Sequence, residues 1–314
     1  MNAPRTRVQR RPVHGVLLLD KPLGLSSNNA LQKCKWLLRA EKAGHTGTLD
    51  PLATGVLPLC FGAATKFSQL QLDADKTYEA TVRLGVKTST ADAEGDVVQE
   101  RPVPAIAVAR LAEVAAQFTG AIRQMPPMHS ALKKDGKALY EYARAGEQVE
   151  RQARDVVVWS LDLAFADGKN ELKLVAKVSK GTYIRTLGED IGEALGCGGH
   201  LTSLRRIAAG HFDLSGCITL DELEALGEQE RVSRLKPVDS LLPGHTVLTL
   251  DIDNAGRFLS GLRRRGSWQD NEHIAVFGEH PRALLGTAHV KGGELIPGRL
   301  LSPPEVAQIL ESNL

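Results

Sequence analysis

The chain has 314 residues, of which 42% are hydrophobic and 24% are charged, and these values exclude a disordered protein. A chain of this length is expected to form one large domain and one small domain. The formal net charge of +2 excludes a uniformly basic protein, so only local charge can indicate a nucleic-acid partner. No apolar run reaches the ~20 residues of a membrane helix, and four scattered cysteines favour a reducing compartment, so we expect a cytoplasmic protein.

The first predicted feature is a basic N-terminal arm, residues 1–12. It contains Arg5, Arg7, Arg10 and Arg11, and no acidic residue occurs before Asp20. Two interpretations remain open, a disordered tail that aids solubility or an arm that contacts phosphate groups.

The next segments read as a strand, a helix and a loop. Residues 15–21 (GVLLLDK) form a short apolar run typical of a buried strand. Ser26 or Ser27 can cap a helix whose apolar residues recur on one stripe, namely Ala30, Leu31, Cys34, Leu37 and Leu38. Residues 44–55 contain three glycines and a proline, so this segment is predicted to be irregular.

The middle of the chain mixes strands and helices. Alternation predicts strands over residues 78–85 and 172–178. Helical periodicity predicts helices around residues 111–118 and 184–195, and Thr219 with Glu222 forms a capping-box pattern that opens another helix. Residues 124–154 have weak apolar patterning and many basic residues, which indicates a protruding insertion.

The C-terminal part is predicted to be a separate small domain. Residues 236–244 contain two prolines and a glycine and read as a linker, and residues 245–314 combine glycines with short apolar stretches typical of a mostly β domain. Strands and helices follow no strict βαβ order, so α+β is the predicted fold class.

Several chemistries lack their sequence motifs. The chain contains neither G-x-x-x-x-G-K-[ST], nor G-x-G-x-x-G after a strand, nor H-E-x-x-H. Cys197 and His200 form a lone C-x-x-H, which is half of a zinc site without a second half nearby. We therefore expect no cofactor and no metal.

Asp50 is the strongest candidate for catalysis. It lies in the glycine-rich segment and precedes Pro51, which favours an extended backbone at Asp50. A carboxylate on such a loop can act as a nucleophile while already ionised. The alternative is a turn aspartate that bonds its own backbone, and spacing alone favours that alternative.

Longer motifs favour catalysis. Residues 43–57 read AGHTGTLDPLATGVL and residues 18–27 read LLDKPLGLSS. Together with residues 75–85, 123–146, 179–196 and 200–210, they closely resemble the TruB family of tRNA pseudouridine synthases. The resemblance covers residues 13–242. It implies a mixed, mainly antiparallel sheet flanked by helices in a catalytic domain (13–243), a thumb insertion (124–154) and a small PUA-type RNA-binding domain (245–314).

The resemblance implies roles for three catalytic residues. Asp50 matches the family nucleophile, Arg185 the cation that keeps this carboxylate charged, and Tyr78 the tyrosine that stacks on the target uracil and is positioned for proton transfer. The sequence leaves alternatives open: Arg185 could form a surface pair with Glu189, and Tyr78 could be a core aromatic residue.

The resemblance also implies a set of substrate-binding residues. His45 corresponds to a histidine that fills the space left by the flipped base, and flipping costs a few kcal/mol. Lys21 fits a scaffolding role, Lys66 a phosphate contact and Asp92 an acidic position near the pocket. Tyr183 and Leu204 match positions that line the uracil pocket.

The implied substrate is tRNA, recognised at its T-arm, and the implied reaction converts uridine 55 of the T-loop to pseudouridine. Contacts to the RNA backbone are expected from Lys133, Lys134, Lys137, Arg144, Arg263, Arg264 and Arg265, although the last three could instead form a solvated surface. His129 stands where relatives often have tyrosine, which puts details of RNA contact in doubt.

We expect a monomer without an obligatory protein partner. Three alternatives differ from this function: an RNA-folding chaperone, a guide-RNA-directed relative within a multi-protein particle, and a hydrolase that releases free base.

Overall fold

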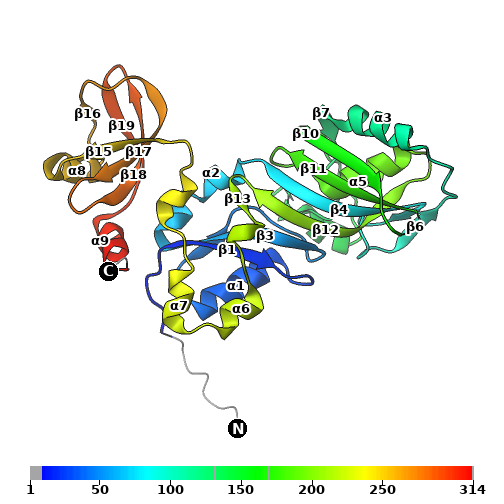
Figure 1. The fold of residues 1–314 in the computed structure, drawn as a ribbon, viewed down its shortest axis with the longest axis horizontal. Coiled ribbons are helices and arrows are strands. Elements are labelled where there is room, and N and C mark those ends of the chain that lie inside the picture. Colours follow the sequence, from blue (N-terminus) through cyan, green and yellow to red (C-terminus); the bar gives the residue numbers. More distant parts are fainter. Residues whose placement is uncertain (1–8, 131, 169, 313–314) are drawn as a thin grey trace, which may run out of the picture.

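The structure is a computed structural model that describes residues 9–130, 132–168 and 170–312, and Figure 1 shows a large N-terminal domain beside a smaller C-terminal one. The large domain is built on one long sheet, which confirms the predicted α+β class. No helix among the described residues has both the length and the apolar character that crossing a membrane requires.

The central sheet has ten strands and is mainly antiparallel. Its order is β14-β1-β3-β12-β4-β11-β10-β7, while β2 pairs with β3 and β13 pairs with β12. Within the described part of this sheet, only the β1–β14 and β3–β12 pairs are parallel. The strands are β1 (Gly15–Lys21), β2 (Ala43–His45), β3 (Ala53–Phe61), β4 (Lys76–Leu84), β7 (Gly120–Gln124), β10 (Arg154–Phe165), β11 (Glu171–Val178), β12 (Gly199–Ala209), β13 (Phe212–Asp213) and β14 (Ile218–Thr219).

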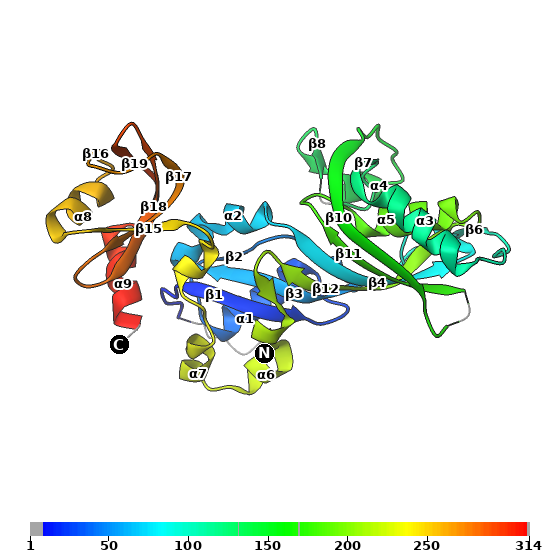
Figure 2. The ribbon, with the colours of Figure 1, turned by 45° about the horizontal axis from the view of Figure 1, so that its top comes forward.

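Four helices pack against one face of this sheet. Leu31, Leu111, Leu187 and Leu223 come from four different helices and share one buried cluster with the inward side chains of the strands. These helices are α1 (Ser27–Leu37), α3 (Val108–Phe118), α5 (Ile184–Ala194) and α6 (Leu220–Ala225). Figure 2 shows α1 and α6 under one half of the sheet and α3 and α5 beside the other.

Local sequence signals explain where these helices begin. The Ser26 side chain accepts a hydrogen bond from the Asn29 amide, so Ser26 is the residue that caps α1. The Thr219 hydroxyl accepts from the Glu222 amide while the Glu222 carboxylate accepts from the Thr219 amide, which is the predicted capping box of α6.

The C-terminal domain contains a five-stranded sheet of order β15-β17-β18-β19-β16. This composition confirms the predicted small β-rich domain and is consistent with a PUA-type fold. Its elements are β15 (Thr246–Leu250), α8 (Ile252–Leu259), β16 (Arg264–Arg265), β17 (Asn271–Gly278), β18 (Ala283–Lys291), β19 (Glu294–Leu300) and α9 (Pro303–Ser312).

The two domains share a hydrophobic cluster on the second face of the sheet. Phe67 and Leu241 from the large domain pack there with Phe277 and Leu284 from the small one. The predicted linker over 236–244 is therefore partly wrong, because residues 238–241 form the 3-10 helix η3 (Val238–Leu241) and bury their apolar side chains. The elements beside it are η1 (Gly62–Lys66), α2 (Ser68–Leu72), η2 (Leu214–Gly216) and α7 (Glu228–Ser233).

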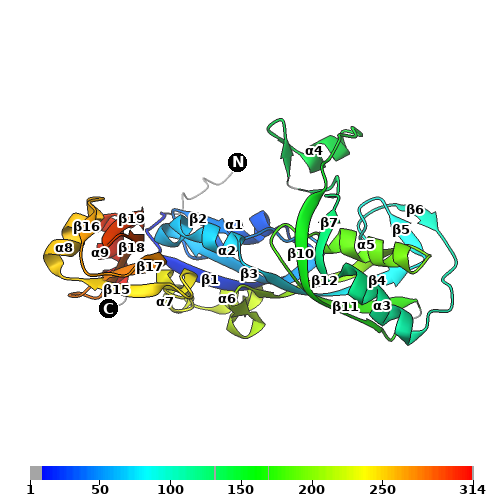
Figure 3. The ribbon, with the colours of Figure 1, turned by 90° about the horizontal axis from the view of Figure 1, so that it is seen from above.

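Two segments extend from the sheet. The insertion 124–154 carries β8 (Lys133–Lys134), β9 (Lys137–Ala138) and α4 (Leu139–Arg144), and Figure 3 shows it projecting away from the body of the molecule. A hairpin of β5 (Val86–Thr88) and β6 (Val97–Glu100) follows β4, and Figure 3 shows it at the end of the molecule away from the C-terminal domain.

The basic arm is described only from residue 9 onward, so Arg5 and Arg7 lie outside the described residues. Arg10 donates to the Ala40 carbonyl at 2.9 Å, and Arg11 forms an ion pair with Glu228 at 3.2 Å. Both arginines therefore contact the large domain, which neither interpretation of the arm anticipated.

Candidate active site

The loop between β2 and β3 presents Asp50. The Ser27 hydroxyl fixes it by donating to the Leu49 carbonyl at 2.9 Å and accepting from the Leu49 amide at 2.7 Å. The Ala53 amide donates to the Asp50 carbonyl at 3.0 Å. At Gly55 a Cβ would collide with the Arg206 backbone, so only glycine lets β3 and β12 approach so closely here.

A buried arginine joins two carboxylates at this loop. Arg185 Nη2 lies 2.9 Å from Asp50 Oδ2, and Arg185 Nη1 lies 3.2 Å from Asp92 Oδ2. The same guanidinium donates to the carbonyls of Thr90 and His129. The Arg185 side chain is 6% exposed and that of Asp50 is 38% exposed. The arginine is therefore buried, whereas the carboxylate of Asp50 remains partly accessible. A surface pair between Arg185 and Glu189 is therefore wrong.

The pKa of Asp50 is shifted in the direction opposite to that expected from an ion pair with Arg185 alone. Burial raises the pKa of Asp50 above its ordinary value, and the negative charge of Asp92 acts in the same direction. The positive charges of Arg185 and Lys21 oppose this shift without overcoming it. The expectation that Arg185 controls the protonation of Asp50 is therefore incomplete, because one guanidinium serves two carboxylates and burial dominates.

Asp50 opens into a cavity of about 440 Å³. Tyr78 from β4, Tyr183 at the start of α5 and Leu204 from β12 contribute to its wall. Tyr78 also packs against the hydrophobic core, so it both lines the cavity and fills the core. The remaining lining is Gly47, Thr48, Leu49, Ala53, Leu72, Lys76, Ser130, Leu132, Val178, Ser179, Gly181, Thr182, Ile184, Arg185 and Arg206.

Four predicted substrate-binding residues do not line this cavity. Asp92 lies behind Arg185 and is 1% exposed. Lys21 is fully buried and its ammonium donates to the carbonyls of Pro22 and Leu25, which agrees with a scaffolding role; burial lowers the pKa of Lys21 to about 8. His45 lies on β2, where burial lowers the pKa of its imidazole.

Lys66 contacts the C-terminal domain. Its ammonium forms an ion pair with Glu305 at 2.6 Å and donates to the Leu300 carbonyl at 2.9 Å. The predicted phosphate contact is therefore not supported by its position in this structure, where Lys66 joins the two domains.

Two cations that sequence reasoning missed belong to the cavity wall. Arg206 is 1% exposed and donates from Nε to the Val56 carbonyl at 2.7 Å and from Nη2 to the Gly47 carbonyl at 3.4 Å. Lys76 donates to three carbonyls at the end of α2, and burial lowers its pKa to about 8. The sequence contained one signal for Arg206, namely the adjacent pair Arg205-Arg206. Neighbouring side chains of a strand point to opposite faces, so one of the two arginines must face the side of the sheet that carries the cavity.

The residues predicted to contact RNA backbone lie on two surfaces. In the insertion, Lys133 and Arg144 are exposed, Lys134 donates to the Glu150 carbonyl, and Lys137 lies 4.2 Å from the Tyr142 ring centroid. In the C-terminal domain, the nearby acid Glu294 lies 3.1 Å from Arg263 and 3.8 Å from Arg265, and Arg264 donates to Asn254. The second surface is thus less positive than its sequence implies.

No metal site accompanies these residues. Within the described ranges, no group of three or more His, Cys, Asp or Glu side chains is arranged to hold a metal ion. Cys197 is buried and His200 contacts the Val86 carbonyl at 2.8 Å, so this C-x-x-H is part of the packing.

Comparison with known proteins defines the class. The model of the TruB family pseudouridylate synthase N-terminal domain matches residues 35–184, and that of the tRNA pseudouridylate synthase B C-terminal domain matches residues 185–243. The chain belongs to the TruB family of pseudouridylate synthases, and it is therefore an enzyme.

Individual relatives extend this similarity over nearly the whole chain. The tRNA pseudouridine synthase B of Verminephrobacter eiseniae is 65% identical and covers 99% of this chain and 96% of its own length. That of Cupriavidus pinatubonensis is 57% identical and covers 94% and 96%.

Solved structures share the fold. A Cbf5-Nop10-Gar1 complex contains a chain with a TM-score of 0.68 and 24% identity, covering 98% of this chain and 92% of that one. An H/ACA RNP bound to a substrate RNA containing 2'-deoxyuridine gives a TM-score of 0.67 and 22% identity, covering 92% and 86%.

Proposed function

We propose that this enzyme isomerises uridine 55 in the T-loop of tRNA to pseudouridine, with Asp50 as the nucleophile. The observation that carries the proposal is the half-exposed Asp50 carboxylate, held 2.9 Å from the buried Arg185 guanidinium at the wall of a 440 Å³ cavity. The relatives from Verminephrobacter eiseniae and Cupriavidus pinatubonensis are tRNA pseudouridine synthases by name, which supports tRNA as the substrate.

The cavity suits a flipped uridine. It is within the ~300–1,000 Å³ range of small-molecule sites, and a base inside a folded RNA reaches such a site only by leaving its stack. The half-buried rings of Tyr78 and Tyr183 supply flat surfaces against which a uracil can pack. We assign Tyr78 to proton transfer near C5, as the family resemblance implies.

Arg185 supports the chemistry by holding the ionised form of Asp50. Its guanidinium is fixed by Asp92 and by two backbone carbonyls, so it needs no reorganisation when substrate binds. The N1–C1′ bond of uridine breaks, the free uracil turns, and C5 forms the new bond to the ribose; C5 then loses its proton and N1 gains one, so the product is an isomer of the substrate. The carboxylate either attacks the sugar or removes a ribose proton, and both routes require Asp50 to be ionised.

The Asp50→Asn variant tests this assignment. We expect pseudouridine formation in a tRNA transcript, followed by mass spectrometry with chemical tagging, to disappear while tRNA binding is retained. The matched control is Asp155→Asn, because that carboxylate is 92% exposed on β10 and lies outside the cavity. Turnover of Asp50→Asn near the control level refutes the nucleophile.

The purified chain on bare tRNA separates the remaining alternatives. Activity without added protein or guide RNA supports a stand-alone enzyme over the guide-directed one, and free uracil among the products would indicate a hydrolase. Restoration of tRNA folding by Asp50→Asn would add a chaperone role. Steep loss of binding with salt is expected if Lys133, Lys134, Lys137, Arg144, Arg263, Arg264 and Arg265 contact phosphate groups.

A further inference from the structure

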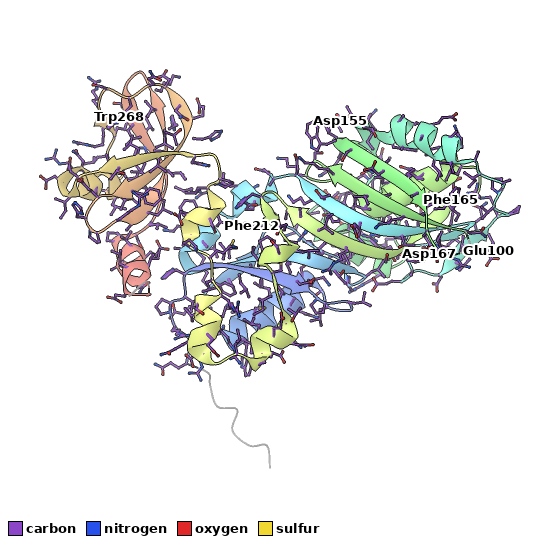
Figure 4. The ribbon with its side chains drawn as sticks, viewed as in Figure 1. Glu100, Asp155, Phe165, Asp167, Phe212 and Trp268 are labelled. Atoms are coloured by element: carbon purple, nitrogen blue, oxygen red, sulfur yellow. The ribbon has the colours of Figure 1, made fainter. Side chains whose placement is uncertain are left out.

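Four charged side chains join the β5–β6 hairpin to α5. Lys87 Nζ, from β5, lies 2.7 Å from Glu189 Oε1 and 2.6 Å from Glu193 Oε1. Arg101, which directly follows β6, places its Nη2 2.6 Å from the same oxygen of Glu193. Figure 4 places Glu100, the last residue of β6, at the end of the molecule away from the C-terminal domain. We call Lys87, Arg101, Glu189 and Glu193 the hairpin clamp.

The hairpin clamp is a partly buried network rather than a set of surface pairs. Its side chains are between 21% and 39% exposed. Gly198 makes room for them, because a Cβ there would lie 2.5 Å from Arg101 Nη2 and 2.8 Å from Lys87 Cγ. Burial acts to lower the pKa of Lys87, but its hydrogen bonds to Glu189 and Glu193 outweigh burial and raise the pKa above its ordinary value. The ammonium is therefore charged and fully engaged by these two carboxylates.

One face of α5 carries both the clamp glutamates and the arginine of the active site. Arg185, Glu189 and Glu193 are four residues apart and so lie in a row along the helix. Arg185 contacts the Thr90 carbonyl at 3.1 Å and the Asp92 carboxylate at 3.2 Å, both in the loop between β5 and β6. The hairpin and α5 therefore meet at two places, and one of them includes the guanidinium beside the nucleophile candidate.

Separate contacts hold the hairpin to β12. The Val86 carbonyl lies 2.8 Å from His200 Nδ1, and the Ala91 carbonyl accepts from the Leu201 amide at 3.1 Å. Ala91 has a φ of 59°, a region that non-glycine residues occupy at an energetic cost, so the loop keeps this shape only while its neighbours hold it. Because β12 does not carry Arg185, contacts to β12 do not fix the loop relative to that arginine. The hairpin clamp supplies this connection.

We propose that Lys87 is a positioning residue for the isomerisation and acts through Arg185. Its two ion pairs hold the hairpin on α5, so the Thr90 carbonyl and the Asp92 carboxylate stay on the guanidinium. The guanidinium in turn stays beside Asp50. Lys87 is not among the residues that line the cavity, so it acts without touching the substrate. This proposal rests on the proposed function, because positioning is measured as a change in the rate of pseudouridine formation.

Lys87→Met tests the proposal by removing the charge while keeping most of the aliphatic chain. The single-turnover rate at saturating enzyme should fall about tenfold or more, since a ~1 Å shift of a catalytic group can cost about 100-fold. The dissociation constant for a tRNA transcript should stay the same, because the ammonium is already engaged by two carboxylates. The unfolding temperature should fall by only about 2–4 °C. Lys87→Arg should recover most of the rate, since a guanidinium can bond both carboxylates.

Two further variants separate positioning from general loosening of α5. Glu189→Gln removes one of the two ion pairs and should give a smaller rate loss in the same direction. Arg110→Met is the matched control, because Arg110 donates to the Ala194 carbonyl at 3.0 Å and so holds α5 from α3 rather than from the hairpin. It should keep the wild-type rate. In an Asp92→Asn background, Lys87→Met should lower the rate by a smaller factor than in the wild type, because both changes act on the same contact.

Several outcomes overturn the positioning role of Lys87. They are a wild-type rate in Lys87→Met, an equal rate loss in Arg110→Met, a full additional loss in the Asp92→Asn background, and weaker tRNA binding with an unchanged rate, which would make Lys87 an RNA contact. Each of them leaves pseudouridine formation by the wild type intact. If the wild type itself leaves the transcript unmodified, the proposed function fails instead.

Discussion

Arg206→Met should disable the enzyme without unfolding it. Arg206 joins the two ends of the Asp50 loop, since its guanidinium donates to the carbonyls of Gly47 and Val56. Methionine fills much of the same buried volume but cannot donate to either carbonyl. The loop should then lose the contacts that hold Asp50 at its place beside Arg185.

The structure gives the size of both effects. The 2.7 Å bond to Val56 is a full charge-assisted hydrogen bond, worth ~1.5–3 kcal/mol, and the 3.4 Å contact to Gly47 adds little. Burying a cation has a desolvation cost, and Arg206→Met removes that cost. The net free energy of unfolding should therefore fall by about 1–3 kcal/mol. A shift of the carboxylate by ~1 Å can cost about 100-fold in rate, which far exceeds the loss of stability.

Single-turnover pseudouridine formation at saturating enzyme and thermal unfolding together measure these two effects. Arg205→Met is the matched control, because Arg205 is the neighbour on the same strand, faces away from the cavity and pairs with Asp20 at 2.6 Å. It should lose about 1 kcal/mol or less of stability and keep its single-turnover rate. A wild-type rate in Arg206→Met, or equal rate losses in both variants, refutes a positioning role for Arg206.

Three further predictions concern charge. The rate should rise with pH through the pKa of Asp50, and because burial raises that pKa, the midpoint of the acid limb should exceed the ordinary ~3.9; a midpoint at or below this value contradicts the assignment. Asp92→Asn removes one of the two carboxylates that Arg185 contacts, so stability should fall by ~1.5–3 kcal/mol and the single-turnover rate should fall as well; unchanged unfolding would contradict this. Lys66→Met should increase hydrogen exchange in α9, since Lys66 pairs with Glu305 across the domains, and unchanged exchange would argue against this contact as a restraint.

Local sequence determined much of the secondary structure and the family to which the chain belongs. Strand β1 and the caps of α1 and α6 follow from apolar runs and from side chains that bond amides three residues away, and such signals need no distant partner. The motif around Asp50 identified the family because it is long and rare. The element predicted least well, residues 236–244, depended on a distant surface: the segment is helical because Val238 and Leu241 are buried in the cluster shared by both domains.

The tertiary structure decided how the site is held together. Asp50, Asp92, Arg185 and Arg206 come from separate parts of the chain, and no spacing shows that one guanidinium serves two carboxylates. Charge counting could not show that Lys66 is used between the domains, nor that Lys87 pairs with two glutamates of α5. Which polar groups meet depends on how the sheet brings distant strands together, whereas which groups are available is already written in the sequence.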